Sequence, residues 1–145
     1  MKYFIPLLPF LAGWLVLLLS ANFMQISLIN GLLQILLFAL VVCLPTWRTR
    51  RMSYVDIGWP WGLVVIGVVA WIMAEGDAVR VAIVSLAYIF AGARMGIGAL
   101  MLWKNGHLKQ ELPRYEYQKR RWEKADKSKV ARAMQIEAIL QGLAN

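Results

Sequence analysis

Residues that bind metals or form disulfides are almost missing from this sequence. Cys43 is the only cysteine and His107 the only histidine, so the chain can form no internal disulfide and no cluster of cysteine or histidine metal ligands. The glycine-rich patterns by which many soluble domains bind nucleotide phosphates are also absent. We therefore expect no metal site, and no motif identifies a catalytic residue.

Charged residues are scarce as well. They make up 17% of the chain, whereas 60% of the residues are hydrophobic and the mean hydropathy is +0.57. Soluble domains average about 25% charged and about 45–50% apolar residues, and a small soluble domain buries too little of its surface to hide such an excess. The composition therefore predicts a single membrane domain over residues 1–145.

Negative charge is the scarcer of the two signs. Eight acidic residues stand against 16 lysines and arginines, which gives a net charge of +8. In a soluble protein this excess would suggest nucleic acid, but here the basic residues gather beside apolar runs, as in cytoplasmic loops that contact anionic lipid. We expect membrane lipids, and no nucleic acid, as partners.

Four apolar runs are long enough to cross a bilayer, which takes about 20 helical residues. None alternates as a barrel strand would, and an open sheet cannot stand in lipid. The sequence therefore predicts an all-α transmembrane bundle of four spanning helices, with a helix pair in residues 1–52. The runs cover roughly Tyr3–Ser20, Ile26–Leu44 (ended by Pro45), Ile57–Ala74 and Val79–Trp103.

The charges of the connections predict the orientation in the membrane. Arg48, Arg50 and Arg51 follow the second run, and the tail after the fourth run is also basic, whereas the third connection holds Glu75 and Asp77. Because positively charged loops stay in the cytoplasm, we expect a bacterial inner-membrane protein with both termini cytoplasmic.

A polar segment over residues 107–134 follows the fourth run. Pro113 suits the first turn of a helix, and Tyr115, Gln118 and Trp122 recur at spacings of three and four, so they share one helical face. Two interpretations stay open: a basic helix lying on anionic headgroups, or a wall that binds a phosphorylated cofactor. The last residues turn apolar again and predict either the start of a fifth helix or an amphipathic tail.

Arg94 is the only charged residue among residues 86–102 of the fourth run. An arginine at the bilayer centre costs about 2.5–3.5 kcal/mol on insertion scales, and such residues often mark functional sites. Ala91 and Gly98 leave its face nearly bare, and Gly92 and Gly96 form a small-xxx-small pair that lets another helix come close. Arg94 either binds an anion within the bundle or snorkels to the membrane surface.

Further polar residues gather near the cytoplasmic ends of the predicted helices. Asp56 stands at the start of the third run, where it either caps the helix or pairs with Arg94 or a basic loop residue. Glu111, Arg114 and Tyr115 form a compact group just outside the membrane, and arginine suits bidentate phosphate binding.

Three segments resemble one bacterial membrane family in order and spacing: "SYVDIGWPWGLVVIGVV", "AGARMGIGALML" and "ELPRYEYQKRRWE". This domain-of-unknown-function family is related to steroid 5-alpha reductases and isoprenylcysteine carboxyl methyltransferases, and the resemblance covers about residues 53–145. The positions that match its motifs are Asp56, Trp59, Gly62, Gly92, Arg94, Glu111, Arg114 and Tyr115.

The sequence also departs from the family pattern. Ala91 stands where the family usually has tryptophan, Gly98 where it usually has histidine, and Leu112 where it has a second acidic residue. No stretch resembles the late H-P-N-Y-x-x-E region, which supplies much of the cofactor site in the reductase relatives.

The resemblance implies the N-terminal portion of a membrane oxidoreductase that uses NADPH on a lipid or sterol-like substrate and is incomplete alone. Arg94, Glu111, Arg114 and Tyr115 would form its cofactor pocket, and a second chain would supply the missing C-terminal half. The methyltransferase relatives use S-adenosylmethionine, so the cofactor stays open. The alternative is a small non-enzymatic membrane protein whose basic tail binds anionic lipid or a partner protein; a transporter subunit is disfavoured because only Arg94 lies deep.

Overall fold

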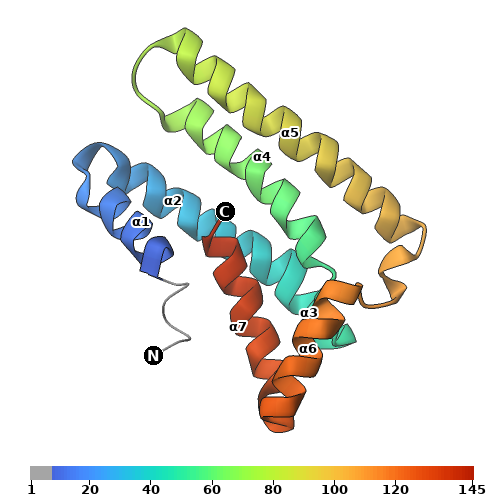
Figure 1. The fold of residues 1–145 in the computed structure, drawn as a ribbon. Coiled ribbons are helices and arrows are strands. Elements are labelled where there is room, and N and C mark those ends of the chain that lie inside the picture. Colours follow the sequence, from blue (N-terminus) through green and yellow to red (C-terminus); the bar gives the residue numbers. More distant parts are fainter. Residues whose placement is uncertain (1–7) are drawn as a thin grey trace.

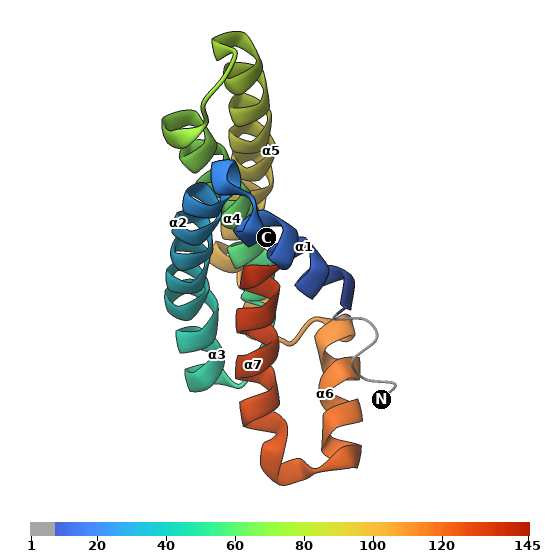
Figure 2. The same ribbon diagram turned by 90° about the vertical axis from the view of Figure 1, so that its left-hand side faces the viewer.

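The computed structural model describes residues 8–145 and contains only helices and their connections within that range. The predicted all-α class is confirmed (Figures 1 and 2). The α-helices are α1 (Leu8–Leu19), α2 (Ala21–Phe38), α3 (Leu44–Thr49), α4 (Val55–Met73), α5 (Ala78–Lys104), α6 (Pro113–Ala125) and α7 (Val130–Leu143). A π-helical turn, η2 (Ala39–Cys43), joins α2 to α3, and short 3-10 turns, η3 (His107–Lys109) and η4 (Lys127–Lys129), flank α6.

Three helices are long and apolar enough to span a membrane: Phe23–Thr49, Val55–Met73 and Ala78–Lys104. The first continues past Pro45, where the sequence predicted its end. Pro45 has no N–H to donate, and it is the second residue after the π turn. We attribute the unbroken course of the helix to this wider turn, which relieves the clash that a proline ring makes with the preceding turn.

Within residues 8–145 the structure has three candidate spanning helices rather than the four expected, so the count of four is not confirmed. The described part of the first run forms α1, which has 12 residues and reaches about 18 Å, short of the roughly 30 Å hydrocarbon core. The expected start of that run at Tyr3 lies outside the described residues. α1 packs against α2, as Figures 1 and 2 show.

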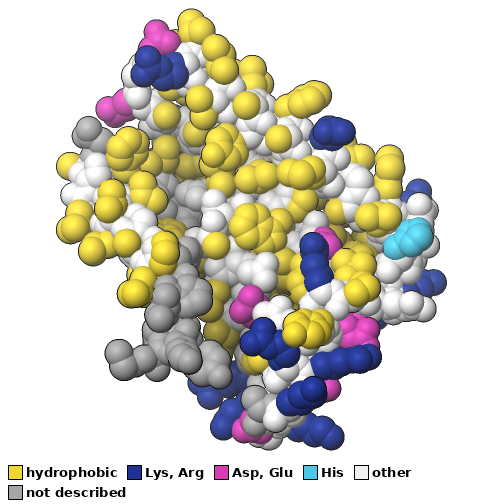
Figure 3. Space-filling view, in the orientation of Figure 1, with side chains coloured by type: hydrophobic (Ala, Val, Ile, Leu, Met, Phe, Trp, Pro, Cys, Tyr) yellow, Lys and Arg dark blue, Asp and Glu magenta, His cyan; other side chains and the backbone are white. Residues whose placement is uncertain are grey.

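The connections gather at two opposite ends of the bundle. Residues Ala21–Ile26 and Met73–Glu75 contribute to one hollow and so share an end. At the other end Arg51 Nη1 donates to the carbonyl oxygen of Leu108 at 2.9 Å, and most of the lysines and arginines lie there, over α6 (Figure 3). We call this the basic end. The arginine-rich loop and the acidic loop therefore lie at opposite ends of the bundle.

Small residues let α4 and α5 approach closely. A Cβ atom added at Gly92 would lie 2.6 Å from the carbonyl oxygen of Pro60, and one added at Gly96 would lie 2.9 Å from the indole ring of Trp61. The predicted small-xxx-small contact is therefore confirmed. The opposite side of α5 carries exposed apolar side chains such as Ile83 and Phe90, as a lipid-facing helix does.

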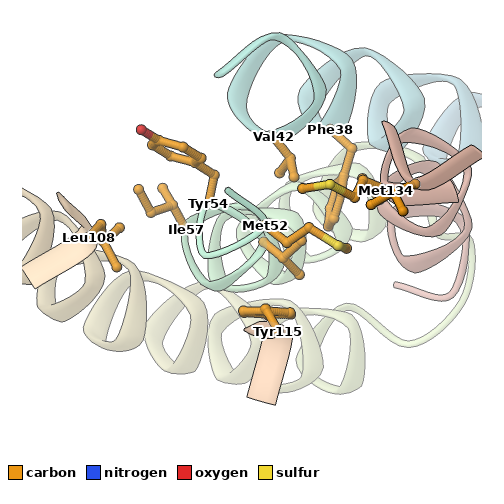
Figure 4. Packing of buried hydrophobic residues seen from close by; sticks show 11 residues of the cluster. Phe38, Val42, Met52, Tyr54, Ile57, Leu108, Tyr115 and Met134 are labelled. Atoms are coloured by element: carbon orange, nitrogen blue, oxygen red, sulfur yellow. The ribbon is translucent and has the colours of Figure 1, made fainter. Parts of the chain in front are cut away.

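The hydrophobic core lies at the basic end, where α2, α4, α6 and α7 meet (Figure 4). Phe38 and Val42 come from the first long helix and its π turn, Met52 from the loop before α4, and Tyr115 from α6. α7 buries Val130, Met134, Ala138 and Gly142 against these elements. The apolar tail of the sequence is thus a packed part of the bundle.

Candidate functional site

An open cavity of about 1040 Å³ lies between α4, α5 and α6 at the basic end. Its two long walls are apolar: Trp59, Pro60 and Leu63 on α4, and Met95, Gly98, Ala99, Met101 and Leu102 on α5. Polar side chains line its lip: Asp56, Asn105, Arg114, Tyr115, Gln118 and Gln141. The arrangement can receive an amphiphile whose apolar body lies along the helices and whose polar end reaches the lip.

The sequence explains the shape of the α5 wall. Residues 95, 98, 99 and 102 recur at spacings of three and four, which places them on one helical face. A Cβ atom added at Gly98 would meet nothing within 4 Å. The position usually occupied by histidine in the resembling family is therefore open space along this wall.

Asp56 joins α4 to α6 at the lip of the cavity. Tyr115 Oη donates to Asp56 Oδ1 at 2.6 Å, and the Arg114 guanidinium forms an ion pair with the same oxygen. The guanidinium also lies 4.7 Å from the centre of the Tyr115 ring. The Asp56 side chain therefore neither caps α4 nor pairs with Arg94. It pairs with another basic residue, Arg114, at the start of α6.

The chemistry of Tyr115 follows from this packing. The residue is 6% exposed, and burial raises the pKa of its hydroxyl above the ordinary value of 10.0, although the adjacent Arg114 opposes the rise. Tyr115 is therefore a protonated hydrogen-bond donor at neutral pH, and its proton is directed to Asp56.

Glu111 joins the loop before α4 to the loop before α6. Its carboxylate accepts hydrogen bonds from the backbone N–H groups of Met52 (2.9 Å) and Ser53 (3.0 Å) and from Ser53 Oγ (2.6 Å). Ser53 Oγ in turn accepts from the N–H of Leu112 at 3.0 Å. Glu111 is absent from the cavity lining, so the structure places it in a contact between loops.

Arg94 is exposed on α5. It is absent from the residues that line the cavity, and it lies one helical turn after the exposed Phe90 and one turn before Gly98. Within residues 8–145 its side chain takes part in no hydrogen bond or ion pair with the protein. Of the four residues predicted to bind a cofactor, Arg114 and Tyr115 line the cavity, whereas Arg94 and Glu111 are absent from its lining.

Gln141 is a lining residue that the sequence did not indicate. It comes from α7, and its Oε1 accepts from Trp59 Nε1 at 2.9 Å while its Nε2 donates to Glu137 Oε1 at 3.1 Å. No local pattern marks it, because only the docking of α7 between α2 and α4 brings a tail residue to the cavity.

The lining fits an NADPH cofactor only in part. Arg114 and Tyr115 present donors at the lip, but the charge of Arg114 is shared with Asp56. The Glu111 carboxylate already accepts hydrogen bonds from Met52 and Ser53, and its negative charge repels phosphate. These residues alone therefore form an incomplete phosphate site.

Comparisons with known proteins place the chain in a family. Residues 42–144 match the family model described as "Protein of unknown function (DUF1295)". Searches of curated proteins and of solved structures found no match. The family match covers α3 to α7, the part that builds the cavity, together with the end of η2. The chain is therefore a member of the DUF1295 family.

Proposed function

We propose that this chain forms the substrate-binding, N-terminal portion of a steroid 5-alpha-reductase-like membrane oxidoreductase that acts on a lipid or sterol-like molecule. The observation that carries the proposal is the cavity between α4, α5 and α6, which has apolar walls and a polar lip. Its volume of about 1040 Å³ slightly exceeds the usual range for small-molecule sites, about 300–1,000 Å³.

The position of the cavity supports a substrate drawn from the membrane. Its α5 wall belongs to a helix that is long and apolar enough to span a bilayer, so the apolar body of a lipid can lie against Met95 and Leu102. The polar end would then meet Gln118, Asn105 and Tyr115 at the basic end. Trp59, a further motif position of the resembling family, lies in the α4 wall, whereas Gly62 faces Gln34 and Asn145 on another side of α4.

The cofactor in this proposal is NADPH, by the resemblance alone. It would supply the hydride for reduction, and the donors of Arg114 and Tyr115 would contact its polar groups. Because Asp56 shares the charge of Arg114 and Glu111 is occupied, we propose that a second chain contributes the remaining contacts. The chain purified alone should therefore bind NADPH weakly, and a large thermal shift at micromolar NADPH would contradict this part of the proposal.

Sterol binding to the purified chain tests the substrate site. Gly98→Trp would place an indole in open space along the α5 wall, so we expect a fluorescent sterol probe in detergent to bind at least about tenfold more weakly. Ile97→Trp adds the same ring at an exposed position outside the lining and serves as the control. Equal binding by both variants and the wild type would overturn the proposal.

A further inference from the structure

A second hollow lies on α6. Its volume is about 580 Å³, and it is lined by Tyr117, Arg120, Arg121, Glu123, Lys124 and Lys127. Tyr115 and Trp122, by contrast, pack against the hydrophobic core. The hollow is therefore on the side of the helix that the bundle leaves free, and it is separate from the cavity described above.

The charge of this hollow is not balanced within the described chain. Four of the six lining residues are cations and one is an acid. Arg120 forms an exposed ion pair with Glu116 at 2.5 Å, but Arg121, Lys124 and Lys127 form none within residues 8–145. A concave surface with three cations outside any ion pair and a single lining acid, Glu123, keeps an excess of positive charge. Such a surface attracts an anion with several acceptor oxygens, such as a phosphate group.

The location of α6 indicates where such an anion comes from. The helix follows the end of α5 at Lys104 after a short connection, so it lies close to the headgroup level of a bilayer that α5 spans. Tyr117 is 67% exposed at the rim of the hollow, and tyrosine favours the membrane interface. Anionic phospholipids attract basic segments at that level.

We propose that this hollow binds the headgroup phosphate of an anionic phospholipid of the surrounding membrane and so holds α6 against the bilayer surface. The guanidinium of Arg121 supplies paired donors, and the ammonium groups of Lys124 and Lys127 supply further charge. The site does not depend on the reductase proposal, because it shares no lining residue with the cavity.

Lipid binding to the full chain in detergent, measured by native mass spectrometry, tests the site. We expect phosphatidylglycerol to bind in preference to phosphatidylcholine. The double variant Arg121→Gln, Lys124→Gln should bind phosphatidylglycerol roughly 30-fold more weakly. This factor corresponds to the loss of about 1 kcal/mol of binding free energy for each of the two basic residues. The matched control, Lys104→Gln with Lys109→Gln, removes two exposed cations from the same end of the molecule and should change binding little.

Three results would overturn the proposal. Equal weakening in both double variants would show that net charge alone attracts the lipid. Equal binding of the two lipids would show that the headgroup charge is not recognised. Displacement of phosphatidylglycerol by inorganic phosphate or pyrophosphate at micromolar concentration would show a site for a soluble anion. Circular dichroism of each variant checks that the helices remain folded.

Discussion

Single carboxylates join segments of this molecule that are far apart in sequence. Asp56 binds Arg114 and Tyr115 across 58 and 59 positions, and Glu111 binds Met52 and Ser53 across comparable distances. Both acids stand in motifs that suggest ligand binding. Their contacts instead orient α6 against α4, so they position the lip of the cavity, and only Asp56 also lines it.

The variant Asp56→Ala tests the first of these contacts. It leaves the buried Tyr115 hydroxyl without its acceptor, and an unsatisfied buried donor costs about 1–3 kcal/mol. We expect a lower unfolding temperature and faster hydrogen exchange over residues 113–125. Glu116→Ala, which removes only an exposed ion pair worth about 0.3–0.5 kcal/mol, is the control. Equal effects of the two variants would contradict the role of Asp56.

The variant Glu111→Gln tests the second contact. The NH2 group of the glutamine amide would replace one carboxylate oxygen and so face backbone N–H groups that now donate to the carboxylate. Because two donors cannot pair, we expect the unfolding free energy to fall by about 2 kcal/mol. Glu75→Gln, at an exposed position in the loop at the far end, should leave stability unchanged. A fully stable Glu111→Gln protein that had lost ligand binding would instead support the predicted binding role.

At the scale of elements, the small residues of α5 lie on two different faces of the helix and have different roles. Gly92 and Gly96 lie against α4, whereas Gly98 opens to the cavity. The same helix therefore holds the bundle together on one side and leaves room for a ligand on another. Helix packing in membranes relies on such close backbone approach, because lipid supplies no hydrophobic drive between helices.

The paired variants Gly92→Ala and Gly98→Ala separate these roles. A methyl group at Gly92 would lie 2.6 Å from a backbone oxygen and 2.9 Å from a backbone nitrogen of α4, which forces the helices apart at a cost of about 1–3 kcal/mol. At Gly98 the methyl group meets nothing, and alanine favours the helix by about 0.5–1 kcal/mol. Thermal unfolding in detergent should show opposite signs, and equal destabilisation would contradict the α4–α5 packing.

At the scale of the whole molecule, the charges divide between two ends. The loops at residues 50–54 and 105–112 lie at the basic end, and the loops at residues 20 and 76 lie at the other. Three candidate spans connect these ends. From the positive-inside rule we expect the basic end to lie in the cytoplasm, which would place the lip of the cavity and α6 on that side.

Reporter fusions test this orientation. Fusions at residues 76 and 110 should report opposite sides of the membrane, because a candidate span of 27 residues lies between them. A fusion at residue 20 should agree with the one at residue 76, since the two loops share an end of the bundle. The same side for residues 76 and 110 would contradict the topology.

Much of the fold could be predicted from local patterns. The helical class, the start of α6 at Pro113 and the close approach at Gly92 each depend on neighbouring residues or on one helical face, so the sequence alone indicated them. The count of four spanning helices is not confirmed, because the described residues hold three candidate spans and α1 has only 12 residues there. The candidate site was predicted in part, since Arg114 and Tyr115 line the cavity and Glu111 does not.

The sequence by itself determined that this chain forms apolar helices with positive charge at one end, because a backbone in lipid must satisfy its own hydrogen bonds and loop charges set orientation. Only the tertiary structure decided which acid meets which base. On sequence grounds several lysines and arginines could pair with Asp56. Because α6 docks against α4, Asp56 contacts Arg114 and Tyr115. Likewise, Gln141 reaches the cavity only because α7 packs into the bundle. Contacts between residues more than 50 positions apart depend on how whole helices pack, and no local pattern encodes that.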